Sequence, residues 1–186
     1  MALGATVRSF DIELSDIDRS VYESFQLKIA QHPSESAEYL VARVLAYALE
    51  HGEGIGFTGG LYDTDQPAVH RQDLTGQRLA WIEVGTPDPV RLHKASKSCD
   101  AVAVYCHKEP RAWLLSLAGS RVHQHDKIAL YALSPRQIRE LAATLGRRHS
   151  WTLSRIEGTL YFESEDHSAE LSIQPLDWPI RASPSL

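Results

Sequence analysis

RLAWIEVGTPDPVRLHKASKSCDAVAVY, residues 78–105, holds two apolar segments separated by a basic segment that begins among prolines. The first apolar segment, 78–84, predicts a strand. Prolines on both sides of Asp88 indicate a helix start, with the aspartate as cap, and the helix is expected over 90–98. Residues 101–105 are typical of a buried strand. A strand-helix-strand unit of this kind predicts two parallel neighbouring strands with a right-handed crossover.

The residues before this unit predict an N-terminal hairpin followed by a long helix. Apolar residues alternate in 7–14 and 25–29, and the polar stretch 16–19 between them favours a turn. A helix is expected to open in HPSE, residues 32–35, where the Ser34 hydroxyl can accept an unpaired backbone N–H. Leucine and valine then repeat at helical spacing until a pair of glycines ends the helix.

A second hairpin is expected to place residues 67–73 beside the strand 78–84. If Thr75-Gly76 is a two-residue turn, counting back along both strands places Ala68 opposite Glu83.

The C-terminal half predicts two further helices, another strand and a closing β-meander with a tight turn at Glu157-Gly158. We therefore expect one domain over residues 1–186, of the α/β class with α+β character. It should have a mixed central sheet, flanking helices and an irregular tail after about residue 175. The remaining elements are expected at 111–119 and 134–145 (helices) and at 128–132, 151–156, 159–163 and 169–173 (strands).

Composition limits the class of protein. A chain of 186 residues with 43% hydrophobic content can bury a sizeable core. Its two cysteines form no C-x-x-C pair, which fits a reducing compartment, and we expect a soluble, cytoplasmic protein without a signal peptide or membrane partner. The net charge of −5 disfavours coating of nucleic acid. Local basic patches remain open, one at Arg91, Lys94 and Lys97 and one at Arg147 and Arg148.

Two short motifs resemble ligand sites but are better explained as loops. Residues 54–59, GIGFTG, match the dinucleotide fingerprint, but a helix precedes them and no helix follows. His123, His125 and Asp126 are possible zinc ligands. A polar loop before a strand is the favoured interpretation, because short motifs often match by chance.

Glu83 is the residue of this sequence that most clearly indicates a functional site. Strand alternation places it on the same face as Trp81, near the end of an apolar strand. A buried carboxylate needs a partner, because an unpaired buried charge is costly. A metal ion would serve, and so would Arg91 or Lys94, which lie three residues apart on one face of the next helix.

Three stretches carry a family resemblance: HPSE (32–35), WIEVGTP (81–87) and Arg91-x-x-Lys94-Ala95. Together they resemble the YaeQ family, over nearly the whole chain. The resemblance implies a variation of the PD-(D/E)XK nuclease core. In that core, an acid at the start of one strand and a (D/E)-x-K on the next bind a divalent metal and orient a water. A glutamate on the first core helix assists. Carried over, Glu35 is the helix acid and Glu83 the strand acid.

The sequence departs from this nuclease pattern at two positions. Gly85 stands at the lysine of (D/E)-x-K, and Lys94 could replace that lysine from the following helix. Ala68 stands where the other acid would be expected. Asp65, three residues back, is preferred as its substitute over Asp73, which is expected to form a cross-strand ion pair.

Two functions remain open. In the first, the protein is a Mg²⁺-dependent nucleic-acid phosphodiesterase. Glu83, Glu35 and Asp65 would hold the metal, Lys94 would stabilise charge, and Arg91 would bind substrate. In the second, it is a catalytically impaired nuclease-fold module that binds a protein or nucleic-acid partner. Structural explanations also exist for single residues: an ion pair for Glu83, the helix dipole for Glu35 and a turn for Asp65.

Overall fold

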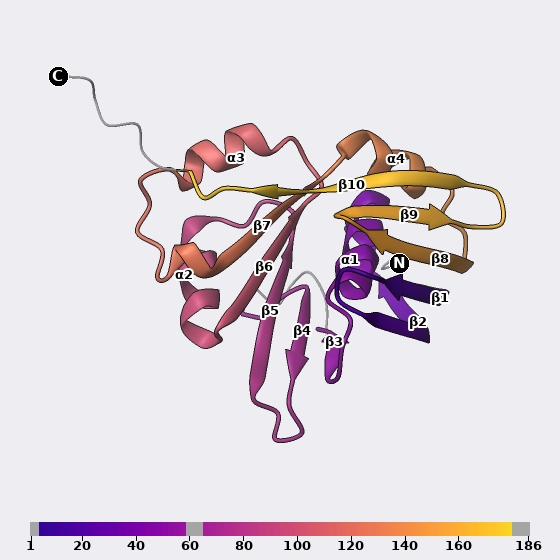
Figure 1. The fold of residues 1–186 in the computed structure, drawn as a ribbon, viewed down its shortest axis with the longest axis horizontal. Helices are drawn as coiled ribbons and strands as arrows, with labels where there is room; N and C mark the ends of the chain where they lie inside the picture. The colour runs from indigo at the N-terminus through magenta and orange to yellow at the C-terminus, as the bar shows by residue number, and fades with distance from the viewer. Residues whose placement is uncertain (1–3, 59–64, 180–186) are drawn as a thin grey trace.

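The computed structural model describes residues 4–58 and 65–179 (Figure 1). In these ranges, ten strands form one sheet that is flanked by four α-helices, as the mixed-sheet prediction requires. The strands are β1 (Thr6–Asp16), β2 (Val21–Gln31), β3 (Ile55–Phe57), β4 (Val69–Gln72), β5 (Arg78–Val84), β6 (Ala101–Cys106), β7 (Ile128–Leu133), β8 (Arg148–Ile156), β9 (Thr159–Glu163) and β10 (Ser168–Leu176). The helices are α1 (Ala37–Leu49), α2 (Pro89–Ser98), α3 (Pro110–Leu117) and α4 (Pro135–Ala143).

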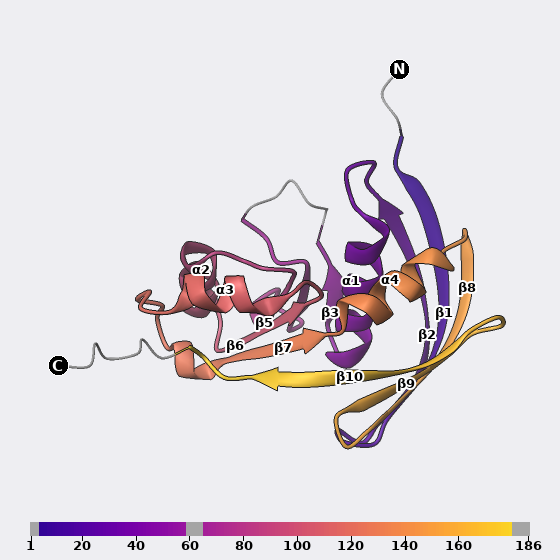
Figure 2. The ribbon, with the colours of Figure 1, turned by 90° about the horizontal axis from the view of Figure 1, so that it is seen from above.

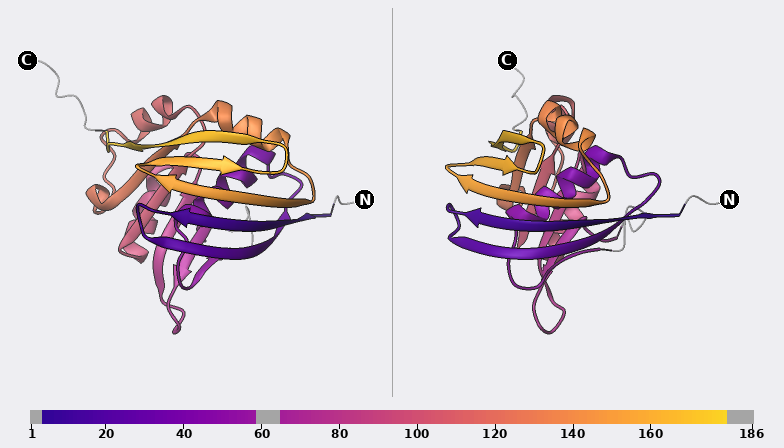
Figure 3. Two further views of the ribbon diagram at one scale, coloured as in Figure 1. Left: turned by 45° about the vertical axis from the view of Figure 1, so that its right-hand side comes forward. Right: turned by 90° about the vertical axis from the view of Figure 1, so that its right-hand side faces the viewer.

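The sheet has the order β2-β1-β8-β9-β10-β7-β6-β5-β4-β3. Strands β5, β6 and β7 are parallel neighbours, β1 and β8 form the other parallel pair, and the remaining neighbours are antiparallel. Strand β10 joins the two halves of the sheet, because its first part pairs with β9 and its last part with β7. Figure 3 shows the β2-β1-β8-β9-β10 half face on.

The curved sheet separates two layers of helices. Helices α1 and α4 lie on its concave side, between the two halves, and α2 and α3 cover the outer face of β5, β6 and β7 (Figure 2). Residues 40–49 of α1 are all buried, because the sheet and α4 surround this helix. Within residues 4–58 and 65–179, no helix is both long and apolar enough to cross a bilayer.

Most of the predicted elements are confirmed. The N-terminal hairpin, the β5-α2-β6 unit and the closing meander all form. Asp88 caps α2, since its carboxylate accepts the Arg91 N–H at 2.8 Å. The turn Glu157-Gly158 has both residues at positive φ, as a two-residue hairpin turn requires. Strand β10 extends to Leu176, one residue into the expected tail, and residues 180–186 of that tail lie outside the described ranges.

The cap of α1 was predicted at the wrong serine. Ser36 caps the helix by accepting the Tyr39 N–H at 3.1 Å, whereas Ser34 contacts the His32 ring, with 2.9 Å between Oγ and Nδ1. A separate turn forms first, in which the Glu35 N–H donates to the His32 carbonyl at 2.9 Å. The helix therefore begins later than HPSE suggests, and Glu35 precedes it.

The hairpin turn also differs from the prediction. The Asp73 N–H donates to the Gln77 carbonyl at 3.0 Å, so the loop contains three residues, 74–76, and not two. The Asp73 carboxylate accepts N–H groups of Thr75 and Gln77, at 2.8 and 2.9 Å. Asp73 therefore stabilises the turn, and the cross-strand ion pair expected for it does not form.

A bulge offsets this longer loop. The register between β4 and β5 shifts between Arg71 and Gln72, which realigns the strands. The ladder then ends at the pair Val69–Ile82, one step short of Ala68 and Glu83. The glycine motif at 54–59 forms the short edge strand β3 at its centre, with α1 before it, while Gly59 lies outside the described residues.

Candidate functional site

The predicted site residues lie near the carboxyl end of β5. Glu83 is the penultimate residue of this strand, and α2, which carries Arg91 and Lys94, starts five residues beyond the strand end. Glu35 lies in the connection between β2 and α1. The sheet therefore places the two glutamates on different segments, one leading to the outer helices and one to the inner helix α1.

Glu83 is buried in an ion pair with Arg91. The glutamate is 3% exposed, and Arg91 Nε lies 2.7 Å from its Oε1. The Trp81 indole N–H donates to the same oxygen, as expected for two residues on one face of the strand. Burial raises the pKa of the Glu83 carboxyl, and Arg91 and Trp81 oppose that shift. The Arg91 guanidinium also donates to the Gln66 carbonyl at 2.7 Å, which fixes its position.

Glu35 is buried in a second ion pair, with Arg43 of α1. Both side chains are nearly inaccessible, and Arg43 Nη2 lies 3.1 Å from Oε1 and 3.3 Å from Oε2 of Glu35. The His32 N–H donates to Oε2 at 3.3 Å. Burial raises the pKa of the Glu35 carboxyl, while Arg43 favours the charged form. The charge of Glu35 is thus balanced by a buried guanidinium. The helix dipole, which was the structural explanation expected for Glu35, adds to this.

Tyr39 connects the two ion pairs. It occupies the first turn of α1, and burial raises the pKa of its phenol to about 12. Its ring meets the His107 ring edge to face, with centroids 6.0 Å apart and planes at 76°. Four charges act on its hydroxyl, those of Arg43, Glu83, Glu35 and Arg91. Both Glu–Arg pairs therefore lie within electrostatic reach of one side chain.

Asp65 and Lys94 form a separate pair at the surface. Lys94 Nζ contacts Asp65 Oδ1, and this contact lowers the pKa of the aspartate. Both side chains are largely exposed, so solvent screens the interaction. The lysine that was expected to assist at Glu83 is therefore engaged by Asp65, and Arg91 holds Glu83 instead.

The two departures from the nuclease pattern have local structural consequences. Ala68 is buried beside the end of the β4–β5 ladder, where an alanine can form no bond to a cation. Gly85 has a φ of +97°, a conformation that side-chain-bearing residues rarely adopt. A lysine at this position would be strained, so the backbone itself disfavours the missing residue of (D/E)-x-K.

The arrangement does not fit a Mg²⁺ ion. Each of the three candidate carboxylates, on Glu83, Glu35 and Asp65, lies against a cationic side chain. In the part of the chain that the structure describes, no three His, Cys, Asp or Glu residues are grouped so that they could hold a metal. This covers the pattern at His123, His125 and Asp126 as well. A metal at Glu83 would compete with Arg91 for Oε1.

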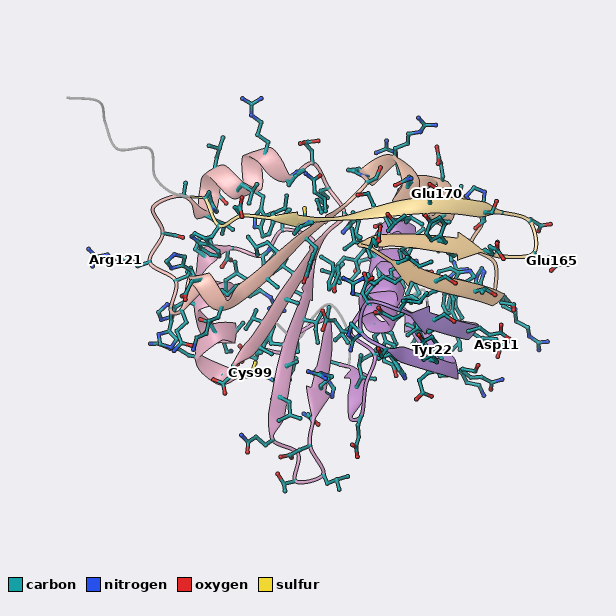
Figure 4. All side chains as sticks on the ribbon, in the orientation of Figure 1. Asp11, Tyr22, Cys99, Arg121, Glu165 and Glu170 are labelled. Carbon is teal, nitrogen blue, oxygen red and sulfur yellow. The ribbon has the colours of Figure 1, made fainter. Side chains whose placement is uncertain are left out.

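A basic strip follows the outer side of α2. Lys94 and Lys97 are exposed, and the Arg91 side chain keeps 24% of its surface exposed. Their spacing of three residues places them along one side of the helix. Figure 4 labels three exposed acids, Asp11, Glu165 and Glu170, on the opposite side of the molecule, within the β1, β8, β9 and β10 region. These three acids, which contribute to the net negative charge of the protein, thus lie away from α2.

Three residues of this neighbourhood were missed in the sequence. Arg43 is a lone charge inside the apolar run 40–49, which could have signalled a buried ion pair. Tyr39 and His107 gave no comparable signal, because a tyrosine on a helix and a histidine after a strand are common. Only the folded chain brings these two rings together.

Comparisons with known proteins agree on one family. A family model described as "YaeQ protein" matches residues 1–173. The uncharacterized protein YaeQ of Escherichia coli K12 is 28% identical over 181 residues, which cover 96% of this chain and 99% of the relative. The crystal structure of YaeQ from Pseudomonas syringae has a TM-score of 0.84 and 31% identity, covering 93% of this chain and 96% of that one. The structure from Xanthomonas axonopodis pv. citri has a TM-score of 0.83 and 28% identity, with 94% and 99% covered.

Proposed function

This chain belongs to the YaeQ family, and we propose that it is a nuclease-fold module that binds nucleic acid without a metal ion. The observation that carries the proposal is the ion pair between Arg91 and Glu83, with 2.7 Å between Nε and Oε1. The family resemblance assigns Glu83 to the strand acid of a metal centre. Here a guanidinium is in contact with that acid.

A guanidinium beside Glu83 favours binding over metal-assisted cleavage. Arginine stays protonated at any physiological pH, so it neutralises the carboxylate permanently. A metal that replaced Arg91 would pair with Glu83 but would leave the guanidinium without its anion, which makes the exchange costly. The Glu35–Arg43 pair presents the same obstacle on α1.

Nucleic acid is the partner that the basic strip of α2 favours. Arginine and lysine bind backbone phosphates, and Arg91, Lys94 and Lys97 lie along one side of this helix. Arg91 is paired with Glu83 and Lys94 with Asp65, so a backbone phosphate would compete with the exposed Asp65 carboxylate for Lys94. The net charge of −5 limits binding elsewhere on the surface.

The proposal is tested by measuring the binding of fluorescently labelled single-stranded and double-stranded DNA and RNA in the presence of EDTA. We expect binding that weakens with salt, and a K94M/K97M double variant that loses about tenfold or more in affinity. Lys28→Met, which removes an exposed lysine of β2, is the matched control and should bind as the wild type does. Wild-type protein that binds none of these probes, or binds only when a divalent metal is added, contradicts the proposal. Capture of a protein partner with no nucleic-acid binding would favour the other kind of module.

A Mg²⁺-dependent phosphodiesterase is the second candidate, favoured by one observation. Glu35 and Glu83 both have carboxyls whose pKa is raised by burial, and both act on the Tyr39 hydroxyl. Grouped perturbed carboxylates are common at catalytic sites. This function requires Arg43 and Arg91 to release their partners. Metal-dependent cleavage of labelled DNA or RNA by the wild type that is lost in Glu83→Gln, while urea melts show this variant to be folded, would establish it and overturn the first proposal.

A further inference from the structure

A pocket of about 500 Å³ lies where three helices begin. Its walls include His107, Lys108 and Glu109, which connect β6 to α3, and Ser36 and Glu38 at the start of α1. The start of α4 completes it and contributes Arg139. The carboxyl ends of parallel strands are where α/β proteins commonly bind ligands, and this volume suits a small molecule.

His107 is the unusual residue of this pocket. Its side chain is 6% exposed, and its Nδ1 is buried with no hydrogen-bond partner among residues 4–58 and 65–179. Burial and the nearby Lys108 lower the pKa of the imidazole to about 4, against the opposing influence of Glu38. The ring is therefore neutral near pH 7, and one of its nitrogens carries a proton that it can donate. A buried polar group without a partner is costly, so an acceptor that reached this ring from the pocket would relieve that cost.

The walls also offer positive charge. Lys108 and Arg139 are exposed cations at the rim. Helix α3 has no side-chain cap, because Glu109 at its N-cap position makes no such hydrogen bond, so its first N–H groups are open to another acceptor. Glu38 and Glu109 balance the two cations in formal charge. The partial positive charge of the helix N-termini remains, and it favours an anion.

We propose that this pocket binds a small molecule through an oxyanion, a phosphate or carboxylate group, that accepts a hydrogen bond from His107 and is held by Lys108 and Arg139. The site is independent of the proposed nucleic-acid binding. It shares no residue with the Glu83–Arg91 pair or with the strip on α2. Tyr39 contacts the His107 ring but is not among the residues that line the pocket.

Calorimetric titration of the full chain at pH 7 tests the proposal, with inorganic phosphate in one arm and acetate in the other. We expect saturable binding of at least one anion. His107→Phe keeps a ring against Tyr39 but removes both nitrogens, so it should weaken binding about tenfold or more. The double variant K108M/R139M should weaken binding to a similar degree.

Two controls keep the result interpretable. Arg136→Met removes an exposed arginine of the same helix α4 that pairs with Glu140 outside the pocket, and it should bind anions as the wild type does. Lys108 and Arg139 are exposed, so their substitution leaves the fold intact even if His107→Phe is destabilised, which urea melts would show. Phosphate binding without acetate binding would identify a phosphate ligand, and the reverse a carboxylate. The proposal fails if neither anion binds, or if K108M/R139M binds as tightly as the wild type.

Discussion

Arg91 Nε lies 2.7 Å from Glu83 Oε1, at the junction between β5 and α2. This contact joins a buried carboxylate near the end of a strand to a guanidinium on the first turn of the next helix. The Asp88 cap fixes the start of that helix and so the Arg91 backbone, while the Gln66 carbonyl holds the guanidinium. The Glu83–Arg91 ion pair therefore makes the charge of Glu83 a requirement of the fold, and Glu83 is also a candidate functional residue.

We predict that Glu83→Gln destabilises the fold. We expect no effect on metal binding, because the wild type itself should bind no metal at this site. The substitution leaves Arg91 without its anion, which should lower the free energy of unfolding by about 3 kcal/mol, because Arg91 keeps some access to water. Urea melts measure the loss, and Mn²⁺ titration of the wild type by calorimetry should give no saturable heat.

The matched control is the double variant E83Q/R91M, which removes both charges and should recover part of the lost stability. Strong Mn²⁺ uptake by the wild type that disappears in Glu83→Gln, with an unchanged urea midpoint, would instead favour the metal-dependent enzyme.

His107 should make stability depend on pH. Its folded pKa of about 4 lies below the ordinary histidine value of 6.5, so the unfolded chain binds the extra proton between these values. The stabilising contribution is fully present above pH 6.5 and is lost as the pH falls towards 4. The loss should amount to roughly 2–3 kcal/mol over this window.

The measurement is a series of urea melts from pH 7.5 downward, for the wild type and for His107→Phe. The difference between the two curves isolates His107 from the other titrating groups, among them Glu35 and Glu83, whose raised pKa values act in the opposite direction. Parallel curves for the two proteins would show that His107 is not held neutral.

Gly85→Lys should fail to restore a nuclease-like site. The backbone φ of +97° strains any residue with a side chain, so the substitution should cost about 1–2 kcal/mol of stability. Gly85→Ala carries the same strain without the charge, and the two variants should have similar urea midpoints. Gly146→Ala is the control, because no positive φ applies there and its added Cβ would have only an ordinary contact at 4.0 Å. Metal-dependent cleavage gained by Gly85→Lys would contradict this expectation.

Local patterns were sufficient to predict most of the fold. Strand alternation, proline positions and the Asp88 cap act within a few residues, and they identified β5, α2 and β6 with nearly their observed bounds. The predicted turn was wrong, because the loop is one residue longer than expected. The bulge at Arg71–Gln72 shifts the register back, so the last pair of the ladder, Val69–Ile82, lies one step before the predicted pair of Ala68 and Glu83.

The pairing of charges could not be predicted in the same way. Arg91 and Lys94 are both possible partners of Glu83 from their spacing on one helix face, and no sequence pattern distinguishes between them. The choice depends on where residues 65–66 lie, since Asp65 engages Lys94 and the Gln66 carbonyl accepts from Arg91. Tyr39 lies 44 positions before Glu83, and no sequence pattern connects them, although the charge of Glu83 contributes to the raised pKa of Tyr39 in the folded chain.

Arg43→Met should be among the more damaging substitutions on α1, because it leaves Glu35 as a buried carboxylate without a cation. The side chains of both residues are at most 4% exposed, so water cannot replace the lost partner. We expect a loss of about 3–5 kcal/mol in the free energy of unfolding at pH 7.

The loss should shrink as the pH falls, because protonation of Glu35 removes the unpaired charge. Glu35→Gln in the Arg43→Met background is the matched control and should recover much of the stability at pH 7. Urea melts of the wild type, the two single variants and the double variant, at pH 7 and pH 5, give the coupling energy directly. A coupling near zero would mean that the pair contributes nothing to the fold, and the reason for burying Arg43 in α1 would then have to be sought in function.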